Sequence, residues 1–189
     1  MSKHDPRLVT LKCAEGLPNL RTRRAAEVVQ RGMRLAQRRE FRIVHYSIER
    51  NHVHMILEAD DAAALANGMR SFTCRAARGL NRVWGRRGAV FPERFHDRPL
   101  RSLLQVRNAL RYVLNNYLKH GHPQQRDGCA VLGDPFSSAD CFTGWRELAP
   151  ESDAGRPGTI VVPGRWKLSV GWRTRYPLIS AAEAPGAAS

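Results

Sequence analysis

A β-hairpin is predicted by one stretch of the chain: Phe41-Arg-Ile-Val-His-Tyr-Ser-Ile48, then Glu49-Arg-Asn51, then His52-Val-His-Met-Ile-Leu-Glu58. Both flanking segments are rich in β-branched and aromatic residues, which favour strands, and the polar residues between them are typical of a tight turn. Side chains alternate between the two faces of a strand. His52 and His54 are therefore expected on one face, and the apolar side chains between and after them on the other.

Further elements are predicted on both sides of this hairpin. Residues 7–13 alternate weakly and predict a strand, and residues 90–101 predict extended chain. Apolar residues at helical spacing predict three helices: 22–36, 60–84 and, after a Ser102-x-x-Gln105 capping box, 102–119. The order β-α-β-β-α-β-α predicts an α+β fold. We expect a ferredoxin-like antiparallel sheet with two helices on one face and an added C-terminal helix.

The character of the chain changes after Gly121. Pro, Gly and Ser become frequent there, and three tryptophans stand in isolation: Trp145, Trp166 and Trp172. Such composition is typical of irregular structure. We therefore expect one domain over residues 1–121 and a mostly irregular extension over residues 122–189.

The charge of the chain indicates a polyanionic partner. Its 189 residues carry 31 Lys and Arg against 17 Asp and Glu, a net charge of +14, and residues 1–120 alone hold 24 basic and 10 acidic residues. Arginine dominates, since only four of the 31 are lysine, and its planar fork binds phosphates and stacks on bases. Nucleic acid is therefore favoured over a membrane surface, with an arginine-rich proteome as the alternative explanation.

The composition also excludes several classes of protein. No window approaches about 18 consecutive apolar residues, so no membrane span is expected. The N-terminus has no apolar stretch typical of a secretory signal. The four cysteines form no close pair, which argues against a zinc knuckle or a disulfide framework. We expect a cytoplasmic protein without a membrane partner. The sequence leaves the oligomeric state open, a homodimer included.

Two clusters of side chains are candidates for chemistry. His52 and His54 can grip one divalent metal ion from their shared strand face, although two half-buried strand histidines are the commoner meaning of such a pair. Tyr112 and Asn116 lie four residues apart on one face of the last predicted helix. Asn116 can add a carboxamide oxygen to a metal, and Tyr112 can act as a nucleophile once its phenol is activated. The alternative is an amphipathic helix whose tyrosine fills a groove and whose asparagine is solvated.

Three segments together are more specific than either cluster: Asn51-His-Val-His-Met-Ile-Leu57, Val90-Phe-Pro-Glu-Arg-Phe-His-Asp-Arg98 and Arg111-Tyr-Val-Leu-Asn-Asn-Tyr117. In sequence and spacing they resemble the single-tyrosine HUH transposases, in particular the REP-associated tyrosine transposases of bacteria. The resemblance covers about residues 6–121. Many members follow the tyrosine with Ile-His-Leu-Asn-Pro, whereas this chain has Val113-Leu-Asn-Asn-Tyr117. The asparagine four positions after the tyrosine is kept.

The resemblance implies a role for each matched residue. His52, His54 and Asn116 would bind Mg²⁺ or Mn²⁺, with Asn115 as a competing ligand. Tyr112 would attack a phosphate of single-stranded DNA and become a 5′-phosphotyrosine. The family also implies a DNA hairpin as the recognition element. The leading hypothesis is therefore a metal-dependent endonuclease and strand-transferase, a transposase, acting on hairpin-bearing DNA.

Residues near the end of the second predicted helix are candidates for DNA contacts. Trp84 would stack on bases, and the candidates for contacts with the DNA backbone are Arg75, Arg78, Arg82, Arg86 and Arg87. Packing of Trp84 against the core is an equally good interpretation. The main alternative function is a domesticated, non-catalytic nucleic-acid-binding module. A metal-dependent hydrolase of small phosphoesters is disfavoured by the net charge of +14.

Overall fold

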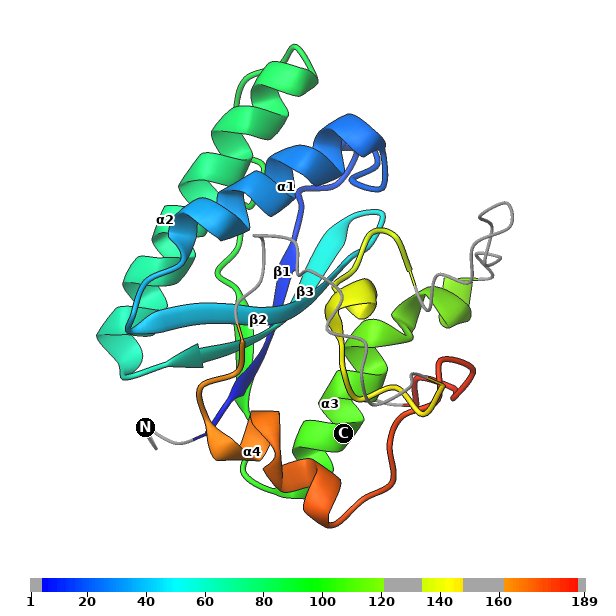
Figure 1. Ribbon diagram of the computed structural model, residues 1–189. Coiled ribbons are helices and arrows are strands. Elements are labelled where there is room, and N and C mark those ends of the chain that lie inside the picture. Colours follow the sequence, from blue (N-terminus) through cyan, green and yellow to red (C-terminus); the bar gives the residue numbers. More distant parts are fainter. Residues whose placement is uncertain (1–4, 121–133, 148–161, 187–189) are drawn as a thin grey trace.

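The computed structural model describes residues 5–120, 134–147 and 162–186 (Figure 1). Its centre is a four-stranded antiparallel sheet in the order β2-β3-β1-β4. The strands are β1 (Arg7–Lys12), β2 (Phe41–Ile48), β3 (His52–Ala59) and β4 (His96–Pro99). This order and the intervening helices confirm the predicted α+β, ferredoxin-like fold.

Two long helices cover one face of the sheet. Helix α1 (Arg23–Ala36) begins after Thr22, whose hydroxyl accepts a hydrogen bond from the Ala25 amide. Helix α2 (Ala62–Val83) begins after Asp61, which caps it in the same way. Both pack on the face that carries Val9, Met55 and the other apolar residues of that parity. Gly68 brings α2 close to β2, because a Cβ there would overlap the Phe41 ring.

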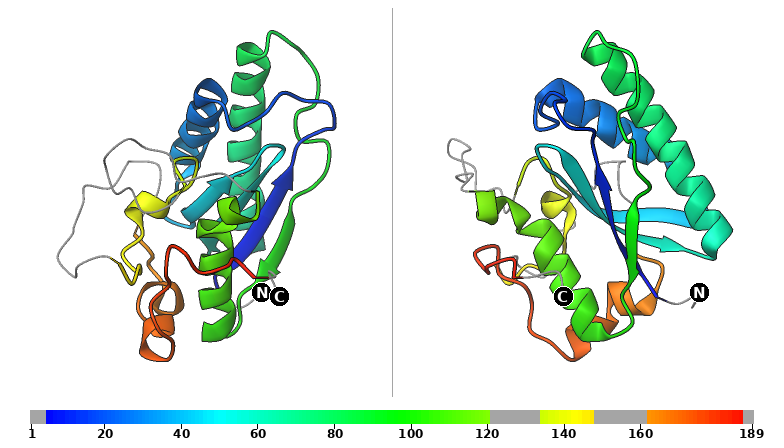
Figure 2. Two further views of the ribbon diagram at one scale, coloured as in Figure 1. Left: turned by 90° about the vertical axis from the view of Figure 1, so that its right-hand side faces the viewer. Right: turned by 180° about the vertical axis from the view of Figure 1, so that it is seen from behind.

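The opposite face is covered by α3 and by the C-terminal part of the chain (Figure 2). Helix α3 (Leu103–Leu114) begins with the predicted capping box, in which Ser102 and Gln105 exchange hydrogen bonds. The C-terminal part contains helix α4 (Trp166–Ser169). The described residues also form 3-10 turns over Asn116–His120, Ala139–Cys141 and Gly171–Thr174. The second core joins Leu8 and Ile56 of the sheet to Leu110 of α3 and to the fully buried Trp145 and Trp172.

A bulge in β2 adapts the sheet to this second layer. Ile43 lies opposite Leu57, and His45 opposite Ile56, so Val44 has no partner in the register. As a result, Val44 and His45 both face the C-terminal segment. The buried His45 ring meets the Phe142 ring edge to face, and its Nδ1 lies 3.2 Å from the Ser138 hydroxyl. This histidine has a packing role in the described structure.

Helix α3 ends earlier than the sequence predicts. The expected helix over 102–119 stops at Leu114, and residues 116–120 continue as a 3-10 turn. The reason is a long-range contact at Asn115, the residue that follows the helix. Its side-chain amide donates hydrogen bonds to the Ser180 carbonyl at 2.9 Å and to the Glu183 carbonyl at 2.7 Å. Helical periodicity carries no information about such a partner, so the prediction was wrong at this end.

Ion pairs attach the C-terminal segments to the rest of the fold. Arg21 forms two hydrogen bonds with Asp134, at 2.7 and 2.8 Å, across 113 residues of sequence. Glu183 binds both Arg107 and Arg111 of α3. The described segments 134–147 and 162–186 thus pack on the sheet, while the domain division at residue 121 stays a prediction. Of the helices in the described ranges, none is long and apolar enough to span a membrane.

Truncation of Trp172 is expected to destabilise the fold strongly. Its indole is fully buried between α3 and the C-terminal turns, so Trp172→Ala leaves a large cavity. We expect the free energy of unfolding in urea to fall by about 3–5 kcal/mol. Trp166→Ala is the matched control, because this tryptophan is 59% exposed, and it should change stability by less than about 1 kcal/mol. Equal effects of the two variants would contradict a core role for the C-terminal segment.

Candidate functional site

The two histidines of β3 meet at the start of the strand, on the face that α3 covers. His52 Nε2 and His54 Nε2 lie 3.0 Å apart, and the rings meet edge to face with centroids 4.6 Å apart. His54 is buried, and His52 is partly open to solvent. Strand alternation predicts that the two side chains share this face, and in the structure their Nε2 atoms lie next to each other on it.

The second ring nitrogen of each histidine is held by an oxygen. His52 Nδ1 lies 2.8 Å from Asn51 Oδ1, and His54 Nδ1 lies 2.9 Å from the hydroxyl of Thr10 on β1. A carboxamide oxygen only accepts hydrogen bonds, so His52 must carry its proton on Nδ1 when neutral. Its Nε2 then presents a lone pair toward His54. Partners of this kind orient imidazoles that bind metal ions.

Tyr112 reaches the same point from α3. Its hydroxyl oxygen lies 3.2 Å from His54 Nε2, and the two rings meet edge to face at 4.9 Å. Burial raises the pKa of the Tyr112 phenol, and the nearby negative charge of Glu49 raises it further. The ammonium of Lys119 lies over the Tyr112 ring, 4.6 Å from its centroid. Tyr112 therefore contacts His54, which in turn contacts His52.

Glu49 is the residue of this site that the sequence analysis missed. It lies in the hairpin turn, where a solvated carboxylate is the ordinary expectation, yet only 2% of its surface is exposed. Burial by itself raises its pKa, but hydrogen bonds from Ser47 and Asn116 and the charge of Arg21 outweigh burial and lower the pKa. The Ser47 hydroxyl donates at 2.6 Å, and Arg21 Nη1 lies 3.9 Å away. Glu49 is therefore a buried carboxylate that stays charged.

Asn116 is buried at the start of the 3-10 turn that follows α3. It does not share a helix face with Tyr112, as the sequence predicted, because α3 ends at Leu114. Asn116 and the charge of His52 both contribute to lowering the pKa of Glu49. Asn115, the competing candidate, faces the C-terminal segment and is used there. Asn115 is therefore occupied by the C-terminal segment, and Asn116 stays the candidate ligand of the two.

The separation of the two histidine nitrogens suits an N···N hydrogen bond and also two ligands of one cation. The two Nε2 atoms are separated by 3.0 Å. Within the described ranges, no three His, Cys, Asp or Glu side chains form a metal-binding group. A third protein ligand here would therefore be of another type, such as the carboxamide of Asn116.

Two other tyrosines, Tyr117 and Tyr46, have their hydroxyl groups elsewhere. The hydroxyl of Tyr117 is buried and lies 3.5 Å from the Ala181 carbonyl oxygen. The hydroxyl of Tyr46 lies on the α1 side of the sheet and accepts a hydrogen bond from Gln30 at 3.0 Å.

The predicted DNA-contact residues lie on the other layer of the molecule. Four of them are exposed on α2 and in the loop after it: Arg75, Arg78, Arg82 and Arg87. Arg86 is partly buried and donates a hydrogen bond to Asn81 at 3.0 Å, and Trp84 packs in part against the first core. Arg75, Arg78 and Arg82 are thus separated from the histidines by the sheet (Figure 2). Their contacts with DNA stay a prediction.

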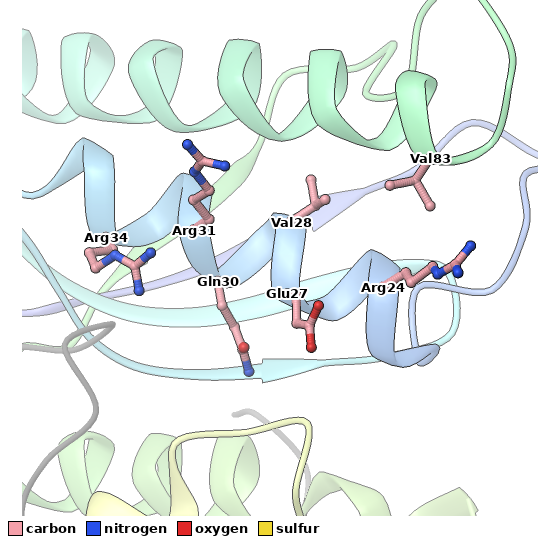
Figure 3. A pocket seen from close by; sticks show the side chains of 7 residues that line it. All are labelled: Arg24, Glu27, Val28, Gln30, Arg31, Arg34 and Val83. Atoms are coloured by element: carbon pink, nitrogen blue, oxygen red, sulfur yellow. The ribbon is translucent and has the colours of Figure 1, made fainter.

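A second group of arginines on this layer lines a hollow on α1, about 430 Å³ in volume (Figure 3). Six of its lining residues come from α1, among them Arg24, Arg31 and Arg34, and Val83 comes from the end of α2. All three arginines are exposed. The basic surface of the helical layer therefore extends over both helices, beyond the residues that the sequence singled out.

Comparison with known proteins identifies the fold. No family model and no curated protein matches the chain. Among solved structures, the fold is similar to that of a REP-associated tyrosine transposase bound to a REP hairpin. The two chains are 19% identical, the match covers 72% of this chain and 78% of the other, and the TM-score is 0.50. The family suggested by the sequence motifs thus includes a protein with this fold.

The hydrogen bond from Asn51 predicts the protonation of the histidine pair. At a pH where His52 is neutral, we expect its proton on Nδ1, because only Nδ1 faces the Asn51 oxygen. Long-range proton–nitrogen NMR correlations of the metal-free protein would measure this. Asn51→Ala should shift His52 toward the Nε2-protonated form, while His96, which is exposed on β4, serves as the internal control. A proton on Nε2 of His52 in the wild type would contradict the described geometry.

Proposed function

We propose that this protein is a metal-dependent endonuclease and strand-transferase for single-stranded DNA that acts through a covalent tyrosine intermediate. The observation that supports it most directly is the position of the Tyr112 hydroxyl, 3.2 Å from His54 Nε2, where His52 Nε2 also converges. A nucleophile and a pair of cation ligands at one point are the groups that phosphodiester cleavage requires. The sequence resemblance and the shared fold support the same class.

The proposed metal ligands are His52, His54 and Asn116, and the cation is Mg²⁺ or Mn²⁺. When bound, such an ion polarises a phosphate oxygen and neutralises charge that develops during attack. Imidazole ligands favour Mn²⁺ relative to the all-oxygen surroundings that Mg²⁺ prefers. Thr10 and Asn51 hold the rings through Nδ1, which leaves both Nε2 atoms for the cation.

Tyr112 supplies the nucleophile in this mechanism. Its Oη forms a bond to phosphorus while the bond from phosphorus to the 3′ oxygen breaks, and the 3′ oxygen gains a proton as the phenol loses one. One phosphodiester is exchanged for another, so a different 3′ end can reverse the step and join two strands. Lys119 lies over the Tyr112 ring, and burial and Glu49 raise the pKa of the phenol, so the reaction requires a group that takes up its proton.

The proposed partner is hairpin-bearing DNA, and its backbone is expected on the helical layer. Within the described ranges, no carboxylate pairs with seven exposed arginines of α1 and α2: Arg24, Arg31, Arg34, Arg70, Arg75, Arg78 and Arg82. By contrast, Arg21, Arg107 and Arg111 are paired with carboxylates. Unpaired guanidinium groups are available for phosphates. The solved relative, bound to a REP hairpin, supports this class of ligand.

The proposed covalent bond to DNA forms at one tyrosine, Tyr112. Wild-type protein incubated with a hairpin-bearing single strand and Mn²⁺ should yield a protein–DNA adduct on a denaturing gel. Tyr112→Phe removes only the hydroxyl, so this variant should bind DNA with unchanged affinity and form no adduct. Tyr117→Phe is the matched control on the same segment and should retain the adduct, because its hydroxyl faces Ala181.

Two results would overturn the proposed enzyme in different ways. Cleavage by Tyr112→Phe would mean that water or another side chain attacks, and a metal-dependent hydrolase would then be the better assignment. Tight hairpin binding by the wild type without cleavage in either Mg²⁺ or Mn²⁺ would favour the non-catalytic binding module.

The salt dependence of DNA binding tests the basic layer. Each phosphate contact to a single strand contributes about 0.7 to the slope of log K against log salt concentration. We therefore expect Arg78→Gln with Arg82→Gln to reduce the slope by about 1.4 if each arginine contacts one phosphate. Arg23→Gln is the control, because this exposed arginine already pairs with Glu27 and should leave the slope unchanged. Equal slopes for all three proteins would remove α2 from the DNA-binding surface.

A further inference from the structure

We propose that β1 and β4, on the sheet face that carries the histidine pair, form a binding site for the single strand of DNA that enters the candidate site, with Lys12 and Arg98 as its phosphate contacts. This inference rests on the proposed function, in which a phosphate reaches Tyr112. It locates the strand to be cleaved. The basic surface of α1 and α2 does not reach this point, because those helices cover the opposite face of the sheet (Figure 2).

The candidate site is closed on one side and open on the other. One row of side chains crosses the sheet through it: Ser47 on β2, His54 on β3, Thr10 on β1 and His96 on β4 lie directly opposite one another. Such residues of antiparallel strands share a face. Along this row, Ser47 is 1% exposed and His54 is 5% exposed, whereas Thr10 is half-buried and His96 is exposed. DNA therefore has access to the histidines from the β4 edge of the sheet.

Helix α3 leaves this edge open because it packs on the other two strands. Its contacts with the sheet are mainly to β2 and β3. Val44 of β2 and Ile56 of β3 are buried in that contact and belong to the second core. The face continues onto β1 and β4 beside the helix, and Thr10 connects the two halves through its hydrogen bond to His54 at 2.9 Å.

The open half of this face is basic. Lys12 lies opposite His52, and Arg98 lies opposite Leu8, so both cations share the face of the histidine pair. Lys12 is exposed and Arg98 is partly exposed. Within the described ranges, no carboxylate pairs with either of them. The rows of Lys12 and Arg98 are four residues apart along β1, about 13 Å, so the two cations are placed for different phosphates of one strand.

Negative charge from these two strands lies on the other face. Asp97 is the only acidic residue in β1 and β4. It lies opposite Val9, whose side chain belongs to the first core, and it pairs with Arg7 on that side. Strand alternation therefore leaves only positive charge on the face that continues from the histidines.

His96 adds an aromatic ring to this surface. It lies in the row between those of Lys12 and Arg98, two strand spacings or about 10 Å from His54. Its side chain is exposed, so the ring is available to stack on an unpaired base. Cations that contact the backbone and a ring that stacks on a base are the groups that single-strand binding sites combine. Stacking of this kind requires a base that is not paired, which favours a single strand over a duplex.

The test compares two hairpin DNAs, one bare and one with single-stranded flanks on both sides of the stem. Affinities are measured by fluorescence anisotropy over a range of salt concentrations without divalent cation, in the Tyr112→Phe background so that no covalent bond forms. We expect Lys12→Gln with Arg98→Gln to lower the slope of log K against log salt by about 1.4 for the flanked hairpin, at about 0.7 for each lost phosphate contact. The bare hairpin should bind with unchanged affinity and slope.

Arg146→Gln with Arg175→Gln is the matched control. This pair makes the same change in net charge at two exposed arginines of the C-terminal segments, and it should leave both slopes unchanged. An unchanged slope for the flanked hairpin in the Lys12 and Arg98 variant would overturn the inference. An equal loss for both DNAs would also overturn it, because the two residues would then contact the hairpin itself.

The role of His96 has its own variants. His96→Ala should weaken binding of the flanked hairpin about fivefold or more, as expected for the loss of one stacked base, and His96→Phe should retain the affinity because it keeps an aromatic ring. Equal affinities of the two variants would contradict stacking at this position. All of these measurements are made without the attacking hydroxyl. Absence of a covalent adduct in the wild type would therefore contradict the proposed enzyme, whereas an unchanged slope would contradict the strand-binding site.

Discussion

The packing of α3 across β3 sets the position of every group in the candidate site. β3 is an inner strand, and both of its faces are covered: one by α1 and α2, the other by α3 and the C-terminal segments. The histidines occupy the second face, where Ile56 anchors α3 through Val113 and its neighbours. The distance between Tyr112 and His54 is therefore fixed by the same apolar contacts that complete the second core.

Charge is arranged differently on the two sides of the sheet. Around the histidines, buried carboxylates and guanidinium groups are matched, and Arg21 connects Asp134 to the neighbourhood of Glu49. Buried ionic groups of this kind contribute little net stability, because their desolvation offsets their attraction, but they restrict the orientation of each partner. On the helical layer, exposed arginines stay solvated. The molecule thus separates a polar site with fixed contacts from an exposed basic surface.

The local patterns of the sequence account for most of the fold. Strand alternation placed the His52 and His54 side chains together, and helical spacing with the Thr22, Asp61 and Ser102 caps located three helix starts. Long-range contacts could not be predicted, because periodicity carries no information about partners far along the chain. The end of α3 depends on carbonyls near residue 180, and the burial of Glu49 depends on groups that only the folded chain brings together. A buried carboxylate in a turn has no local sequence pattern that distinguishes it from a solvated carboxylate.

The dependence of α3 on the C-terminal segment has a consequence for biosynthesis. Ile179 lies more than sixty residues after Tyr112, and its side chain belongs to the core beneath α3. At translation rates of about 5–20 residues per second, Ile179 is synthesised about 3 to 13 s after Tyr112. Helix α3 cannot complete its packing before then. During that interval the nascent chain already contains the arginines of α1 and α2. During synthesis, the arginines of the basic surface are therefore present before the candidate site can assemble.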